Sequence, residues 1–182
     1  MLFGFDVKLN DKDYIDYNNF VLLKSPYGKK LRITMRILFA FVCIALSLIS
    51  IINEQSLTAK LVTLILTAIF LIAAEIAFNP LYAFLNKGMI KLLKGKGKMG
   101  YTPEATLKFY EDLIIEICPD SKTEIKYTSI ERISIVFGKY ILFHLNNVLS
   151  YILPVSSFKS EEETKAFLAF VKTKFSIIDV YD

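Results

Sequence analysis

The chain has 182 residues, of which 54% are hydrophobic and 22% are charged, with a formal net charge of +4 and a mean hydropathy of +0.45. The hydrophobic fraction argues against a wholly water-soluble protein, in which about 45–50% of residues are apolar even when glycine is counted. The charged fraction is nevertheless that of an ordinary soluble domain. The composition therefore favours one membrane unit joined to one small soluble domain.

The first 30 residues predict a strand followed by an amphipathic helix that joins the soluble domain. In residues 2–9, hydrophobic and other residues alternate, which is typical of a half-buried strand. Asn10 or Asp11 can cap a following helix. Hydrophobic side chains then recur at helical spacing, at Tyr14, Tyr17, Phe20 and Val21. The segment Ser25-Pro26-Tyr27-Gly28 breaks this helix.

Residues 31–80 predict a transmembrane helical hairpin. Two apolar runs, Ile37–Ile52 and Leu61–Phe78, each approach or reach the length of about 20 residues that the core of a bilayer requires. Residues 53–60 between them are polar enough to form a turn. Asn79-Pro80 is expected to kink or end the second helix.

Positive charges indicate the orientation of this hairpin, because cytoplasmic loops next to a membrane span are enriched in lysine and arginine. Five basic residues precede the first apolar run: Lys24, Lys29, Lys30, Arg32 and Arg36. Five follow the second: Lys87, Lys91, Lys94, Lys96 and Lys98. The turn has only Lys60 against Glu54. We therefore expect a two-pass membrane protein with both termini in the cytoplasm, and no cleaved signal peptide.

Residues 81–100 form a basic juxtamembrane linker. Lys87, Lys91, Lys94 and Lys98 recur at helical spacing, so this stretch could lie on an anionic lipid surface. The same lysines could equally serve only as the topology signal. Residues 95–100 match the dinucleotide fingerprint G-x-G-x-x-G, but they follow a basic helix instead of a strand, so we interpret them as a linker.

From residue 101 the pattern predicts six antiparallel strands and one closing helix. Turns are expected at Glu111-Asp112, Pro119-Asp120-Ser121 and Gly138-Lys139, with a corner at residues 128–130. A capping box at residues 160–163 begins the final helix.

Two charges inside the apolar region, Arg36 and Glu75, are predicted to be partners. They lie at nearly the same distance from the middle of the turn, with a mismatch of two residues, or about 3 Å along a helix. The alternative is that Arg36 extends to the lipid headgroups and Glu75 is protonated or meets water.

We find no pattern typical of catalysis. His144 is the single histidine and there are two cysteines, Cys43 and Cys118, so a zinc site with three or four such ligands is hard to assemble. We expect His144 to be an outward-facing or hydrogen-bonded strand residue. The expectation is a protein without enzymatic activity, metal or cofactor, whose partners are the lipid bilayer and an unknown protein or peptide, and not nucleic acid.

Several short segments together resemble the bacterial YcxB-like family. They are Asp13-Tyr14, residues 127–133 (YTSIERI), residues 140–143 (YILF) and residues 152–158 (ILPVSSF) before a glutamate-rich helix start. The resemblance implies a pleckstrin-homology-like (PH-like) domain at residues 101–182, an α+β fold with seven strands in an antiparallel barrel or sandwich and a C-terminal helix. The hairpin would be inserted after the first strand, Phe3–Leu9.

The resemblance implies no characterised function, and we expect a membrane-anchored protein of a bacterial cell membrane, without enzymatic activity, that presents a PH-like interaction domain at the inner leaflet. Two alternatives stay open. One is self-immunity against a bacteriocin or toxin, because small immunity proteins can combine a membrane anchor with such a domain. The other is a module that binds anionic lipid through the five lysines between Lys87 and Lys98.

Overall fold

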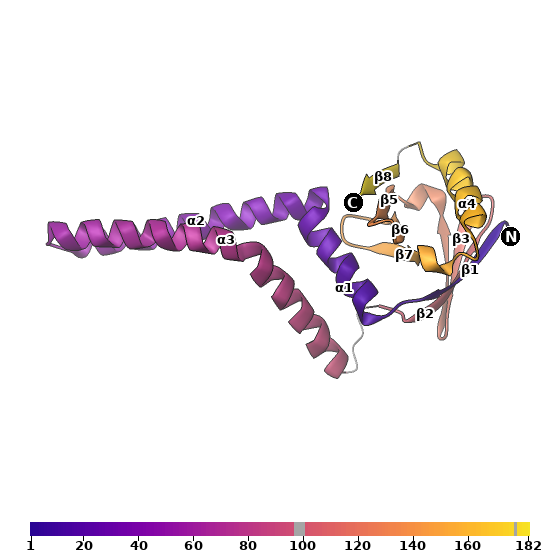
Figure 1. Ribbon diagram of the computed structural model, residues 1–182, viewed down its shortest axis with the longest axis horizontal. Coiled ribbons are helices and arrows are strands. Elements are labelled where there is room, and N and C mark those ends of the chain that lie inside the picture. Colours follow the sequence, from indigo (N-terminus) through magenta and orange to yellow (C-terminus); the bar gives the residue numbers. More distant parts are fainter. Residues whose placement is uncertain (97–100, 177) are drawn as a thin grey trace. The chain divides into compact units, whose positions relative to one another are not determined.

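The computed structural model (Figure 1) describes residues 1–96, 101–176 and 178–182. It divides into two compact units. The sheet unit joins residues 1–21 to residues 90–182, and the hairpin unit consists of residues 22–89. The chain therefore leaves the sheet unit after its first strand and helix and returns to it after the hairpin.

In the described residues, the sheet unit contains two four-stranded sheets. The first has the order β1-β2-β3-β4 and is built from β1 (Phe3–Lys8), β2 (Glu104–Phe109), β3 (Leu113–Cys118) and β4 (Ser121–Lys126). The second has the order β7-β6-β5-β8 and is built from β5 (Arg132–Val136), β6 (Tyr140–His144), β7 (Ser150–Pro154) and β8 (Ile178–Tyr181). Among these residues no strand pair joins the two sheets, so they do not close into a barrel.

The predicted first strand is confirmed. β1 pairs with β2 in antiparallel register from Phe3↔Phe109 to Lys8↔Glu104. Phe5 and Val7 are buried, as the alternation of the sequence requires. The turns at residues 111–112 and 119–120 also lie between strands as predicted. Phe137 and Gly138 both have positive φ angles, 56° and 60°, which reverse the chain between β5 and β6.

Two predictions about the end of the chain are wrong. The helix α4 (Glu161–Lys174), capped by Ser160 as predicted, does not close the chain, because β8 follows it. β8 pairs in parallel with β5, from Ile133↔Ile178 to Val136↔Tyr181, so the strands are not all antiparallel. A strand reached by a crossover through a helix can return in the parallel direction, which a hairpin connection cannot achieve. The unit thus has eight described strands instead of seven.

The core of the sheet unit is centred on Phe167 of α4, which is completely buried. Its ring lies 4.8 Å from that of Phe109 in the first sheet and 6.4 Å from that of Phe143 in the second. It also contacts Phe3 and Phe5 of β1, with ring centroids 5.3 Å and 5.0 Å away. One aromatic side chain therefore packs against both sheets and the N-terminal strand.

β6 is buried along its whole length, which the sequence YILFH already indicates by having no polar alternation. Phe143 and Ile141 face the core between the sheets. On the other face lie the N-terminal helix α1 (Asp11–Asn19) and Phe20, the first residue of the π-helical turn η1 (Phe20–Lys24). Tyr140 donates a hydrogen bond to Asp13 Oδ1 at 2.8 Å, and the ring of Phe20 lies 6.4 Å from that of His144. The remaining short helical turns are η2 (Tyr127–Ser129), at the predicted corner, and η3 (Val155–Ser157).

The hairpin unit contains two long helices, α2 (Pro26–Asn53) and α3 (Leu57–Gly95), which run antiparallel side by side (Figure 1). Ser25 caps α2 and Pro26 is its first residue, so the basic approach to the apolar run is itself helical. The predicted turn at residues 53–60 is too long. Its second half is the first turn of α3, because the Ser56 carbonyl already accepts the Lys60 amide at 3.1 Å.

α3 continues through Pro80 without ending, so the helix is one element up to Gly95. Figure 1 shows it bending along its length, and proline, which removes one helical hydrogen bond, is a known cause of such bends. Residues 81–95 of the predicted linker are therefore helical. The rest of the G-x-G-x-x-G segment, residues 97–100, lies outside the described residues.

The aromatic packing predicts that Phe167→Ala will destabilise the sheet unit by about 3–5 kcal/mol, the usual cost of removing a fully buried phenylalanine. Denaturant-dependent amide hydrogen exchange of β2 and β6 measures this in the full chain. Lys172→Ala, on the exposed face of the same helix, should change the free energy of unfolding by less than about 0.5 kcal/mol. Equal effects of the two substitutions would contradict the central position of Phe167.

Candidate functional site

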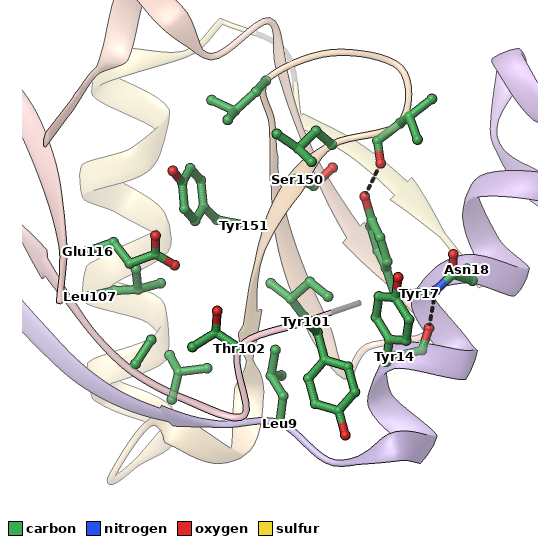
Figure 2. Close-up of a pocket in the computed structure, with 16 residues that line it drawn as sticks. Leu9, Tyr14, Tyr17, Asn18, Tyr101, Thr102, Leu107, Glu116, Ser150 and Tyr151 are labelled. Carbon is green, nitrogen blue, oxygen red and sulfur yellow. Dashed lines mark hydrogen bonds between the residues drawn. The ribbon is translucent and has the colours of Figure 1, made fainter. Parts of the chain in front are cut away.

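The sheet unit has a pocket of about 380 Å³, which we call the tyrosine pocket (Figure 2). Tyr14, Tyr17 and Asn18 of α1 form one side, and Leu107 of β2 and Tyr151 of β7 line the other. Its complete lining is Val7, Leu9, Tyr14, Tyr17, Asn18, Tyr101, Thr102, Ala105, Leu107, Glu116, Leu145, Val148, Leu149, Ser150, Tyr151 and Ile152. A small-molecule pocket usually has about 300–1,000 Å³ and a mostly apolar lining with few polar groups, so this one has the expected size and composition.

Glu116 is the one charged residue in this lining. It lies two residues after Ile114 in β3, and side chains two residues apart in a strand point to the same face of the sheet. Ile114 is buried in the core, so Glu116 also lies on the core-facing side of β3, at the pocket. Burial raises the pKa of Glu116 above its usual value, because desolvation disfavours the charged carboxylate.

Two tyrosines of the pocket are fixed by their hydroxyl groups. Tyr17 donates to the backbone carbonyl of Val148 at 2.5 Å, which ties α1 to the loop between β6 and β7. Tyr101 donates to Asp11 Oδ1 at 2.6 Å, and this hydrogen bond, with burial, raises the pKa of Tyr101 to about 12. Lys94 Nζ approaches the other oxygen of Asp11 at 2.6 Å. The hydrogen bonds from Lys94 and Tyr101 hold the pKa of Asp11 below its usual value.

His144 is buried on the opposite face of β6 from Phe143 and is hydrogen-bonded at both ring nitrogens. Nε2 lies 2.9 Å from Ser134 Oγ, and Nδ1 lies 2.7 Å from Ser150 Oγ. A neutral imidazole has one donor and one acceptor, and the two hydroxyl groups can satisfy both. Of the two roles predicted for His144, the hydrogen-bonded one is therefore correct. Burial, with the nearby charge of Arg132, lowers its pKa to about 4.

The structure brings Arg36 and Glu75 together in the hairpin unit. Arg36 Nη1 lies 2.6 Å from Glu75 Oε1, its Nη2 donates to Asn79 Oδ1 at 3.2 Å, and its guanidinium group lies 4.9 Å from the ring centre of Phe78. Arg32 donates to the same Asn79 oxygen at 3.0 Å. Arg32 and Arg36, which are one helical turn apart in α2, thus both contact Asn79 of α3.

A second polar contact joins the two helices nearer the turn. Ser47 Oγ lies 2.6 Å from Thr67 Oγ1. Each hydroxyl group is also bonded to the carbonyl four residues earlier in its own helix, Cys43 and Thr63 respectively. Polar pairs of this kind connect helices in a bilayer, where no water competes for them.

Four of the five predicted basic residues lie in the described part of the chain, at the end of α3 and just after it. Lys87 and Lys91 are exposed on α3, and Lys96 is exposed in the turn that follows it. Lys94 is paired with Asp11, as described above. Lys98 lies outside the described residues. Within the described ranges, no group of three or more histidine, cysteine or acidic residues could hold a metal ion, and Cys43 and Cys118 are both free thiols.

Sequence reasoning missed the tyrosine pocket, although two signals for it were present. The spacing of Tyr14 and Tyr17 predicts that they share one face of a helix, but it does not show what this face contacts. Glu116 lies in the run LIIEIC, at a position where the alternation of core-facing and outward-facing residues in β3 predicts an apolar residue. An acidic residue at a core-facing strand position is the signal that could have indicated a binding site.

Because its pKa is lower in the folded state than the value of 6.5 of an unperturbed histidine, His144 should be neutral at pH 7. The unfolded chain binds the proton more tightly between these values, so the sheet unit should lose stability as the pH falls from about 6.5 to about 4. Since the chain has one histidine, an NMR titration of its imidazole signals reads the value directly. A His144→Asn variant should lack this component of the acid destabilisation, and titration of His144 near 6.5 would contradict its buried neutral state.

The contact between Arg36 and Glu75 predicts energetic coupling. Arg36→Ala and Glu75→Ala should each lower the yield of folded, membrane-inserted protein, and the exchange Arg36→Glu with Glu75→Arg should restore part of it. In a double-mutant cycle, unfolding in detergent should give a coupling of about 0.5–3 kcal/mol. Lys30→Ala, an exposed residue of the same helix, serves as the control. Strictly additive losses would instead support two independent side chains that extend to the interface.

Comparison with known proteins identifies part of the sheet unit. The sequence profile described as YcxB-like protein matches residues 109–171, from the last residue of β2 into α4. No curated protein and no solved structure matches the chain. The matched range contains Glu116, His144 and Phe167, whereas α1 and the helical hairpin lie outside it. Residues 109–171 of this chain are therefore similar to the YcxB-like protein family.

Proposed function

We propose that this protein is a two-pass protein of the bacterial cytoplasmic membrane that holds a non-enzymatic interaction domain at the cytoplasmic face. The hairpin unit is the anchor and the sheet unit is the domain. The observation that carries the proposal is the exposure of the apolar residues of α2 and α3.

In both helices, none of the most hydrophobic 18-residue window is buried by the protein. Leu46 of α2 and Leu66 of α3 are each 60% exposed, and Ile52 is 78% exposed. Burying one such side chain fully is worth about 1.5–3 kcal/mol, and monomeric soluble proteins seldom expose apolar patches above a few hundred Å². A helix of 28 residues is about 42 Å long, which exceeds the hydrocarbon core of about 30 Å, so a bilayer can cover this surface.

The charges around the helices support the cytoplasmic orientation of both termini. Lysine and arginine are concentrated before the apolar part of α2 and after that of α3, whereas the described turn between the helices has Glu54 and no basic residue. Lys87 and Lys91 are exposed cations one helical turn apart in α3, and each could contribute about 1 kcal/mol of attraction to an anionic leaflet. Binding of anionic lipid by these lysines would therefore assist the anchor.

A PH-like relationship of the sheet unit is part of the same proposal. Its support is the division into a first sheet of β1–β4, a second sheet containing β5–β7, and a helix after the seventh strand that packs on both sheets. β8 is an addition to that arrangement. The self-immunity hypothesis has only the sequence resemblance behind it, and no described contact adds to it.

Labelling of single cysteines tests the anchor and its orientation. In a chain whose Cys43 and Cys118 are replaced by serine, an impermeant thiol reagent should label Ser56→Cys in intact cells. It should label Ser160→Cys only after the cells are opened, because residue 160 belongs to the cytoplasmic sheet unit. Labelling of Ser160→Cys but not Ser56→Cys in intact cells would reverse the orientation, and recovery of the chain in the soluble fraction would refute the anchor.

A further inference from the structure

We propose that the tyrosine pocket binds the ammonium or guanidinium group of a lysine or arginine side chain of a peptide partner, with Glu116 as its counter-charge. This inference rests on the proposed function in taking the sheet unit as an interaction domain. It adds the chemical class of the group that the domain binds, which neither the family match nor the fold identifies.

The charge of the pocket favours a cation. Glu116 is the single carboxylic acid among the lining residues, which include no lysine, arginine or histidine. Among the described residues, Glu116 has no ion-pair or hydrogen-bond partner, whereas two acids of α1 do: Asp11 meets Lys94 and Tyr101, and Asp13 meets Tyr140. A half-buried carboxylate without a partner is costly, and a bound cation would offset that cost.

The fold gives no reason for an acid at this position. Glu116 stands opposite Leu107 in β2 and opposite Thr123 in β4, and the next core-facing position of β3 is Ile114. An apolar side chain would pack there without desolvating a charge. The residue therefore lowers the stability of the sheet, which is what is expected of a group that is used for binding.

The aromatic lining suits a cation on an apolar stem. The rings of Tyr14 and Tyr101 lie 4.9 Å apart, and those of Tyr14 and Tyr17 lie 6.4 Å apart, on the side of the pocket across from Tyr151 (Figure 2). The faces of such rings attract cations within about 6 Å. Leu9, Leu107 and Leu149 provide apolar contact for the methylene groups that precede the charge.

Hydrogen bonding distinguishes a basic side chain from a quaternary ammonium group. A carboxylate accepts N–H groups, which a lysine or arginine side chain supplies and a choline headgroup does not. Ser150 and Thr102 also line the pocket and add further hydroxyl groups. We therefore assign the pocket to a peptide side chain and keep choline as a test.

The test measures binding of N-acetyl-lysine-N′-methylamide to the full chain in a neutral detergent by ligand-observed NMR. The matched probe is N-acetyl-norleucine-N′-methylamide, which has the same peptide groups and no charge. The lysine probe should bind and the norleucine probe should bind much more weakly. Glu116→Gln should weaken binding of the lysine probe about ten-fold or more, because it removes a charged hydrogen-bond acceptor. Tyr14→Leu should weaken it about two- to five-fold.

Glu111→Gln, an exposed acid in the turn between β2 and β3, is the control and should bind the lysine probe like the original chain. Glu116→Gln should keep or raise the midpoint of unfolding, so loss of binding is not loss of the fold. Three results would overturn the proposal: no binding of the lysine probe, equal binding by Glu116→Gln, or a lower unfolding midpoint of that variant. Tighter binding of choline than of the lysine probe would overturn the peptide assignment. Because this assay needs no bilayer and the cysteine labelling needs no ligand, each can fail independently of the other.

Discussion

The packing of Phe167 is the contact on which the sheet unit depends. A sandwich of two sheets without shared strands needs something to hold the sheets at a fixed spacing, and here a single ring from α4 contacts Phe109 on one sheet and Phe143 on the other. Phe109 and Phe143 also contact each other directly, at 5.5 Å. The tyrosine pocket lies toward the opposite end of β1, where Val7 and Leu9 belong to its lining. The aromatic packing around Phe167 thus stabilises the sheet unit, and the tyrosine pocket at the other end of the core is the part that we propose for recognition.

The N-terminal segment contributes to both ends. β1 adds Phe3 and Phe5 to the aromatic cluster, and α1 adds Tyr14 and Tyr17 to the pocket. The hydrogen bond from Tyr17 to the carbonyl of Val148 links α1 to the β6–β7 connection across most of the sequence. Residues 1–21 are therefore an integral part of the sheet unit, although the matched family region begins only at residue 109.

Local signals made most elements predictable. The alternation in β1, the capping residue Asn10 and the turn residues around Gly138 each depend on neighbours in sequence, and the structure has these elements where they were expected. β8 was missed because IDVY is short and gains its place only by pairing with β5, a non-local contact. The contact between Arg36 and Glu75 could be anticipated because helix geometry converts residue counts into depth. The pocket could not, since it combines residues from α1, β2, β3 and β7 whose proximity depends on the tertiary fold.

The insertion of the hairpin between β1 and β2 sets an order of events during synthesis. β1 leaves the ribosome before β2, and Phe109, the partner of Phe3, follows roughly 5–20 s later at usual translation rates. Until then Phe3 and Phe5 have no sheet to join. Closing so long a segment as an unfolded loop would cost entropy that grows with the logarithm of its length. A hairpin that has already formed, with Arg32 and Asn79 in contact near its two ends, brings the flanking segments together beforehand. The hairpin unit would then hold the two flanking segments close together. Assembly of the sheet unit would begin only after the two helices had paired.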